Sequence, residues 1–197
     1  MLTSRRIGVI LAAGRGRRMG GTKQLALWRT PDGEKPLVAA AYDAIRPICD
    51  EFVVVLGHEA DAVADALGER NFHRVDADPD APMFESIRSG LRAARRIDPG
   101  ATVVVQPGDQ PEVALSTLQA LTAWSLKRPG QAILPEYNGQ GGHPVLITPA
   151  VAAIVVDADC PEGLGRFWLD HAELCRRLPV EDAAVIRDID AVGDLST

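Results

Sequence analysis

The chain of 197 residues is long enough to bury one sizeable hydrophobic core, and its 46% apolar and 24% charged residues are ordinary for a globular protein. Its formal net charge of −6 argues against general nucleic-acid binding, and no apolar run is long enough to span a membrane. Cys49, Cys160 and Cys175 lie far apart, without a CxxC pair or a Cys/His cluster. They predict neither a zinc site nor a disulfide framework, and they indicate a cytoplasmic protein.

Positive charge is concentrated near the beginning of the sequence. Residues 1–23 contain six Arg or Lys and no Asp or Glu, whereas the other residues carry 15 cations against 27 acidic side chains. A short basic segment in an otherwise acidic chain fits a small anionic ligand better than a long polyanion. Arg5 and Arg6 precede an apolar run, as in an export signal, but that run is only seven residues long. We therefore expect no export.

Short apolar runs alternate along the chain with stretches whose apolar residues recur at helical spacing. The pattern predicts strands at 7–11, 52–56, 72–75, 102–106 and 132–134, and helices at 37–48, 60–67, 83–94 and 115–127. Strands that alternate with helices favour a mostly parallel sheet covered on both faces. We therefore expect an α/β fold, a single Rossmann-like three-layer domain over residues 1–197.

The pattern is less regular after Tyr137. Residues 139–144 predict a flexible turn before the apolar run 145–147. Helices are expected at 149–156 and 164–171, and the apolar residues of 185–189 suggest a last strand or sheet edge.

A glycine-rich, basic stretch follows the first predicted strand. Residues 11–23 contain four glycines among Arg15, Arg17, Arg18 and Lys23. Glycines let the backbone approach a ligand closely, and backbone N–H groups with nearby cations suit a polyphosphate. The stretch is neither a P-loop, which ends in Gly-Lys-Ser/Thr, nor a dinucleotide fingerprint, which has a different glycine spacing. An exposed basic turn without a ligand is the alternative.

Residues 11–23 read Leu-Ala-Ala-Gly-x-Gly-x-Arg-Met-Gly-x-x-Lys, which resembles the signature of the nucleotidyltransferases that carry a nucleotide onto the molybdenum cofactor. Guanylyltransferases of this family usually read Leu-Ala-Gly-Gly, so Ala13 favours the cytidylyltransferase branch and CTP. The resemblance implies nucleotide contacts in this stretch from Leu11, Ala12, Ala13, Gly14, Arg18 and Lys23.

Asp109 is the first candidate metal ligand. It stands in a Gly/Pro-bounded loop directly after the predicted strand 102–106, where ligands of parallel sheets bind. Magnesium prefers one or two carboxylates together with phosphate oxygens, whereas an aspartate that only caps its own turn is the alternative. The resemblance implies Mg²⁺ on Asp109. It also suggests Asp190 as a metal ligand, because members of the family commonly end in Asp-Ile-Asp-Thr-Pro-Glu-Asp. This chain matches that ending only as far as Asp190, and a solvated acidic tail is the alternative.

Lys23 and Arg18 complete the expected catalytic group. Lys23 would meet the triphosphate as a compact charge, and Arg18 would hold the departing pyrophosphate. Arg15 and Arg17 fit a solvated flank equally well. Residues 85–91 resemble the family's Ser-Ser-x-x-x-Gly-Leu, with Glu85 in place of the first serine. Ser86 is thus expected beside base or ribose, or as a helix N-cap, and Asp78 is a weaker nucleotide contact.

The acceptor side is expected within residues 137–175, where the resemblance places a small substrate-facing section. His143 belongs to a Gly-His-Pro triplet like that of the cytidylyltransferases and would face the pterin, although a structural histidine is the alternative. Arg166 matches a family arginine that would reach the substrate phosphate. The chain departs from the family at Leu27-Trp28, which lacks an intervening proline, and in the long stretch 29–35.

These features lead to one preferred function and two alternatives. The preferred one is transfer of CMP from CTP to molybdopterin, or to its molybdenum-loaded form, with release of pyrophosphate and use of Mg²⁺. A second hypothesis keeps the fold but uses GTP, or a sugar or alcohol phosphate as acceptor. A third is a non-catalytic maturation factor that binds the cofactor. The expected partners are CTP, the cofactor, and a molybdoenzyme or its chaperone, with neither nucleic acid nor membrane.

Overall fold

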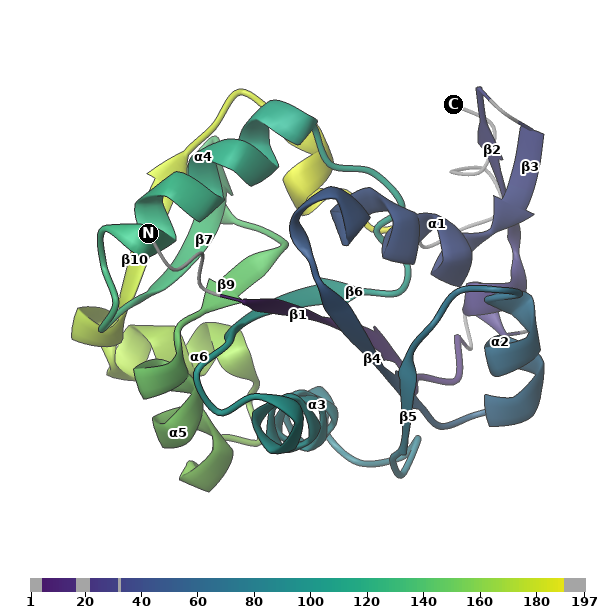
Figure 1. Ribbon diagram of the computed structural model, residues 1–197, viewed down its shortest axis with the longest axis horizontal. Helices are drawn as coiled ribbons and strands as arrows, with labels where there is room; N and C mark the ends of the chain where they lie inside the picture. Colours follow the sequence, from purple (N-terminus) through teal and green to yellow (C-terminus); the bar gives the residue numbers. More distant parts are fainter. Residues whose placement is uncertain (1–4, 17–21, 32, 190–197) are drawn as a thin grey trace.

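The computed structural model describes residues 5–16, 22–31 and 33–189, which form a central β-sheet covered by helices (Figure 1). The sheet order is β10-β7-β9-β6-β1-β4-β5, with β8 added beside β7. Only β8 and β9 run antiparallel to their neighbours, so the sheet is mostly parallel, as predicted. The strands span Arg6–Ala12 (β1), Glu51–Leu56 (β4), His73–Asp76 (β5), Thr102–Pro107 (β6), Ala132–Tyr137 (β7), Gln140–Gly141 (β8), Val145–Ile147 (β9) and Cys175–Pro179 (β10).

Two helical layers cover the two faces of the sheet (Figure 1). Alternate residues of β1 point to opposite faces, so Ile7 and Val9 join one core cluster and Ile10 joins the other. Helices α3 (Met83–Ile97), α5 (Pro149–Asp157) and α6 (Leu164–Asp170) pack in the first cluster. Helices α1 (Leu37–Ile45), α2 (Ala60–Ala66) and α4 (Leu115–Leu126) pack in the second. This confirms the three-layer α/β fold.

The fold differs from the pattern predicted from the sequence in several details. The residues 185–186 form part of a 3-10 helix at Ala183–Ile186, so the predicted last strand is wrong. The edge strand next to β7 is β10, which the pattern did not predict. Helix α1 ends at Ile45, earlier than predicted, and a separate 3-10 turn contains Pro47, which cannot donate the N–H that a continuing helix needs. No helix among the described residues is long and apolar enough to cross a membrane.

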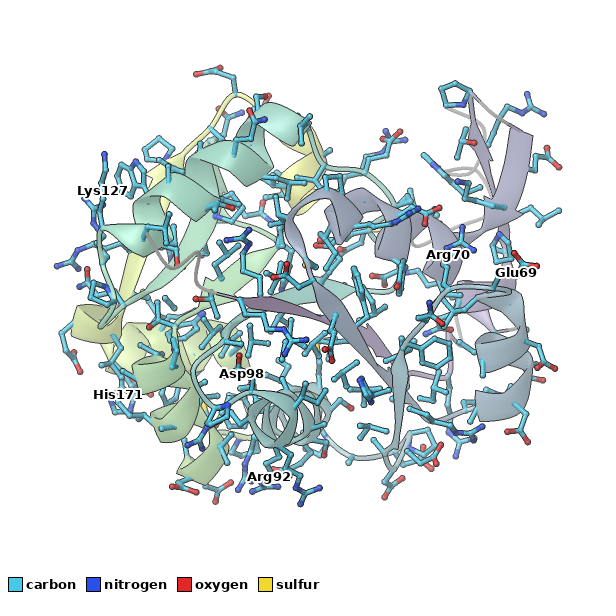
Figure 2. The ribbon with its side chains drawn as sticks, viewed as in Figure 1. Glu69, Arg70, Arg92, Asp98, Lys127 and His171 are labelled. Carbon is cyan, nitrogen blue, oxygen red and sulfur yellow. The ribbon has the colours of Figure 1, made fainter. Side chains whose placement is uncertain are left out.

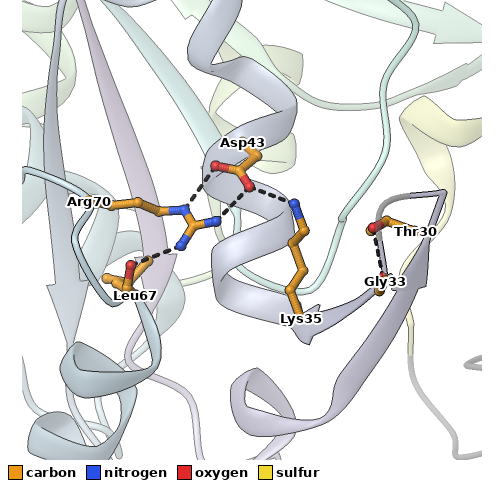
Figure 3. Close-up of polar contacts among 6 residues, drawn as sticks. All are labelled: Thr30, Gly33, Lys35, Asp43, Leu67 and Arg70. Carbon is orange, nitrogen blue, oxygen red and sulfur yellow. Dashed lines mark hydrogen bonds and ion pairs between the residues drawn. The ribbon is translucent and has the colours of Figure 1, made fainter.

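The long stretch after Trp28 forms an antiparallel hairpin of β2 (Leu27–Thr30) and β3 (Gly33–Pro36). Trp28 is 3% exposed and packs with Leu37, Ala40 and Ile189 in a small third cluster. At its outer end, the hydroxyl of Thr30 donates to the carbonyl of Gly33 at 2.7 Å (Figure 3). Through Trp28, the hairpin packs against α1 and against Ile189 near the end of the chain.

Asp43 of α1 ties the hairpin to the loop after α2 (Figure 3). Lys35 donates to Asp43 Oδ2 at 2.9 Å, and Arg70 donates to both carboxylate oxygens at 2.8 and 2.6 Å. Arg70 also donates to the carbonyl of Leu67 at 2.9 Å. Burial acts to raise the pKa of Asp43, but the hydrogen bonds from Arg70 and Lys35 outweigh it and hold the pKa below its usual value.

Candidate functional site

The candidate site lies at the carboxyl ends of β1 and β6. There the described part of the glycine-rich stretch 11–23 (the glycine loop) meets the loop after β6 that contains Asp109 (the Asp109 loop). The N–H of Gly108 donates to the carbonyl of Leu11 at 2.9 Å, which joins the two loops at their bases. A Cβ on Gly108 would lie 2.9 Å from that carbonyl oxygen, so the close approach requires glycine. The site is thus where ligands of parallel α/β sheets bind.

Lys23 and Asp109 come together at this rim, although 86 residues separate them. Lys23 Nζ lies 2.7 Å from Asp109 Oδ2, and the Lys23 side chain is only 9% exposed. Burial is the main cause that raises the pKa of Asp109; Lys23 opposes the shift and the nearby Asp188 adds to it. A buried cation therefore lies beside a carboxylate that lines a cavity.

Asp188 is a second carboxylate at this site, and the sequence interpretation missed it. Its Oδ1 accepts a hydrogen bond from Gln110 Nε2 at 2.6 Å, and the N–H of Ile189 donates to the carbonyl of Asp109 at 3.1 Å. The signal was the pair of aspartates in Asp-Ile-Asp, of which only Asp190 was singled out. Asp190 lies outside the described residues, as does Arg18.

Asp109 and Asp188 are two carboxylates that could help to hold a divalent cation at this site. Among the described residues there is no cluster of three or more His, Cys, Asp or Glu side chains that could hold a metal ion by itself. Two carboxylates nevertheless fit magnesium or manganese, because such hard cations take oxygen ligands and complete their shell with phosphate oxygens and water. The pair suits a cation that is bound together with a nucleotide.

A cavity of about 160 Å³ adjoins this pair. Five predicted nucleotide contacts line it besides Asp109, and they come from β1, the glycine loop, the loop before α3, and α3 itself. The predicted lining residues are Leu11, Ala13, Gly14, Asp78, Ser86 and Asp109. Ala12 does not line it, because its side chain is fully buried in the core on the α1 side of the sheet. Ser86 is not an N-cap, because α3 begins at Met83.

Gln24 is a further lining residue that the sequence interpretation missed. It follows Lys23 directly and is 6% exposed. Its Nε2 donates to the carbonyl of Gly14 at 3.2 Å, which supports the glycine loop. Within the part of the chain that the structure describes, its Oε1 is buried and accepts no hydrogen bond. A buried acceptor of this kind suits a ligand donor.

Arg15 bridges the glycine loop to the loop before α3. Its Nε and Nη2 donate to the two carboxylate oxygens of Asp80 at 2.7 and 2.5 Å. Its Nη1 also lies 3.5 Å from His58 Nδ1. Arg15 is therefore more than a solvated flank of the loop. Arg17 lies outside the described residues.

A second cavity of about 430 Å³ adjoins the first, because Met83 lines both. His143 and Trp168 line it, as does Arg177, which was not predicted. Burial lowers the pKa of His143 to about 4, with Asp188 opposing the shift, so the imidazole is neutral at pH 7. Arg166 lines neither cavity: its guanidinium pairs with Asp170 at 2.8 Å on the exposed side of α6.

Several curated proteins resemble the chain. The molybdenum cofactor cytidylyltransferase of Escherichia coli is 23% identical over 191 residues, which cover 96% of this chain and 93% of the relative. The molybdenum cofactor guanylyltransferase of Pseudomonas putida is 38% identical over 114 residues, 57% of this chain and 54% of the relative. The bifunctional protein GlmU of Paraburkholderia xenovorans is 32% identical over 177 residues, 89% of this chain. The chain spans only 33% of the length of that protein.

Solved structures also resemble it. Rv0371c from Mycobacterium tuberculosis aligns with a TM-score of 0.79 and 28% identity, over 98% of this chain and 96% of that chain. A manganese complex of Rv0371c aligns with a TM-score of 0.74 and 25% identity, over 97% and 96% of the two chains. A model of one family, described as the MobA-like NTP transferase domain, matches residues 8–175. Because this match spans most of the sequence, the chain belongs to the MobA-like NTP transferase family.

Proposed function

We propose that this nucleotidyltransferase transfers CMP from CTP to the terminal phosphate of molybdopterin or the molybdenum cofactor. The observation that carries the proposal is the Lys23–Asp109 pair, whose charged groups are 2.7 Å apart. Asp109 lines the same cavity as Gly14 and Ser86. An oxygen of the acceptor phosphate attacks the α-phosphorus of CTP and forms a new phosphoanhydride bond. The bond between the α- and β-phosphates breaks, and pyrophosphate leaves with its electron pair.

The residues of the rim have distinct roles in this proposal. Lys23 neutralises charge that develops on the departing pyrophosphate, and Arg18 is proposed to assist it. Asp109 and Asp188 would hold Mg²⁺, which supplies Lewis acidity and a template for the phosphates. The manganese complex of Rv0371c supports a divalent cation at this site. Asp190 stays a candidate ligand from the sequence alone.

The proposal also assigns the nucleotide base and the acceptor. Ala13 lines the nucleotide cavity and favours CTP by the family comparison. The similarity to a guanylyltransferase supports GTP as the alternative base. A sugar or alcohol phosphate stays the alternative acceptor from the sequence alone. His143 and the neighbouring cavity of about 430 Å³ are proposed to receive the acceptor. A cytoplasmic location and delivery to a molybdoenzyme or its chaperone stay predictions from the sequence.

Pyrophosphate release tests the proposal directly. CTP, GTP and UTP are each supplied with Mg²⁺ and with molybdopterin, glucosamine 1-phosphate or no acceptor. We expect turnover with CTP and molybdopterin, and a loss of at least about 100-fold in Lys23→Met and Asp109→Asn, since removing preorganised charge costs this much in comparable sites. Cofactor binding without pyrophosphate under any nucleotide would instead support a maturation factor.

Matched controls separate these losses from general damage. Lys127→Met and Glu69→Gln make comparable changes in charge at exposed positions on the outside of the molecule (Figure 2). Both should keep the activity of the unmodified protein. Asp109→Asn with undiminished turnover would remove the mechanism.

A further inference from the structure

Gln110 is a buried amide that contacts one of the two candidate metal ligands and follows the other in the sequence. It is 3% exposed, and its Nε2 lies 2.6 Å from Asp188 Oδ1. Asp109 is its chain neighbour in the loop after β6. The sequence interpretation used this loop only for Asp109. Gln110 therefore connects the two carboxylates without being a metal ligand in the proposed site.

The backbone around Gln110 is held in place on both sides. Gln106 is 1% exposed and donates from Nε2 to the carbonyl of Gln110 at 2.8 Å. The N–H of Gln110 donates to the carbonyl of Pro107 at 3.3 Å, which closes the turn. The N–H of Ile189 reaches the carbonyl of Asp109 at 3.1 Å. The Asp109 loop and the Asp188 segment are thus joined by a main-chain bond and a side-chain bond.

An amide donor suits this position chemically. Asp188 contributes to the raised pKa of Asp109, so two carboxylates already bring negative charge close together here. A neutral N–H group can orient Asp188 without adding a third negative charge, which a glutamate would do. Within residues 5–16, 22–31 and 33–189, this is the one side-chain hydrogen bond that Asp188 accepts, and it uses Oδ1. Oδ2 is left for another ligand.

We propose that Gln110 is a positioning residue, which orients Asp188 so that Asp188 and Asp109 bind one divalent cation together. The inference rests on the metal site of the proposed function, and it adds a residue that touches neither substrate nor metal. Outer partners of this kind hold metal-binding carboxylates in a productive orientation, and their loss weakens metal affinity by about 10- to 100-fold.

Manganese binding to the full chain tests this role without turnover. Free Mn²⁺ is measured by electron paramagnetic resonance during titration of the unmodified protein, Gln110→Met, Asp188→Ala, the double variant of these two changes, and Asp109→Asn. Methionine keeps the approximate volume of glutamine but removes its amide. We expect Gln110→Met to weaken Mn²⁺ binding by about tenfold or more. In the Asp188→Ala background the same change should have no further effect, because Gln110 acts through Asp188.

Gln131→Met is the matched control. Gln131 also donates one hydrogen bond from Nε2, at 2.8 Å to the carbonyl of Glu173, far from the site. Gln131→Met removes a comparable side-chain hydrogen bond, and we expect it to leave the Mn²⁺ affinity unchanged. Should Gln110→Met fail to fold, as judged by circular dichroism, Gln110→Ala replaces it in the same cycle.

The outcomes distinguish this inference from the proposed function. Unchanged Mn²⁺ affinity in Gln110→Met, with weakened binding in Asp188→Ala and Asp109→Asn, would overturn the positioning role and leave the metal site intact. An equal loss from Gln110→Met with and without Asp188 would also overturn it. Unchanged affinity in both Asp109→Asn and Asp188→Ala would instead refute the metal site of the proposed function.

Discussion

Gly90 sets how closely α3 lies on the sheet, and replacing it with alanine gives a quantitative test of the fold. A Cβ at this position would lie 2.4 Å from Val9 Cγ1 and 3.1 Å from Val55 Cγ2. Both valines are fully buried in the adjacent central strands β1 and β4, so neither can move aside easily. Overpacking of this kind costs about 1–3 kcal/mol, and the severe contact at 2.4 Å places Gly90→Ala near the upper value.

Helix propensity offsets part of this cost. Alanine is favoured over glycine in a helix by about 1 kcal/mol, so the net loss in the free energy of unfolding should be about 2 kcal/mol. For a chain of this size that corresponds to a decrease in Tm of about 4–8 °C. Ser86 lies one turn earlier on α3 and lines the cavity that we propose for the nucleotide, so a displaced helix should also raise the KM for the proposed substrate CTP.

Gly165→Ala is the control, because the same change in α6 meets no atom within 4 Å. It should stabilise the protein by about 0.4–1 kcal/mol. Thermal and urea unfolding, followed by circular dichroism, measure both variants. The reasoning is refuted if Gly90→Ala is as stable as Gly165→Ala.

Three further predictions concern titration and capping. NMR titration of the His143 imidazole should give a pKa of about 4 instead of 6.5. Because the unfolded chain takes up this proton at a higher pH than the folded protein, the free energy of unfolding should decrease as the pH falls from 6.5 to about 4. Asp43 has a lowered pKa, so its contribution should be present above pH 3.8 and be lost as the pH falls below that value; Asp43→Asn should abolish this acid dependence in urea unfolding, and an unchanged pH profile would contradict the network with Arg70. Asp182 accepts hydrogen bonds from the N–H of Ala114, at the N-cap of α4, and from Thr117, so Asp182→Ala should cost about 0.5–2 kcal/mol in urea unfolding, whereas Glu181→Ala should not.

The alternating pattern was enough to predict the central strands and helices because each buries one clear apolar run or stripe. The edge strand β10 was missed because Cys175–Pro179 carries two exposed arginines and only two buried side chains. The hairpin β2–β3 was missed because seven of its eight residues are not buried. Val185 and Ile186 are β-branched and suggested a strand, but Asp182 caps a 3-10 helix there.

The candidate site was predictable only where a motif names the residue. Lys23 and Asp109 were singled out from local spacing. That Asp188 approaches Asp109 depends on a contact across 78 residues, through Gln110, which periodicity cannot reveal. Arg166 matched a motif, but its partner Asp170 lies one turn away on the same helix face and holds it outside the cavities.

The hairpin β2–β3 leaves and rejoins the domain at almost one point, since the N–H of Leu37 donates to the carbonyl of Ala26 at 2.9 Å. Its inner end is anchored by Trp28, whereas the Arg29 side chain farther out is 81% exposed. Lengthening or labelling the hairpin near Thr30 would therefore leave the spacing of the sheet unchanged. A fluorophore attached there would report on the rim without entering either cavity.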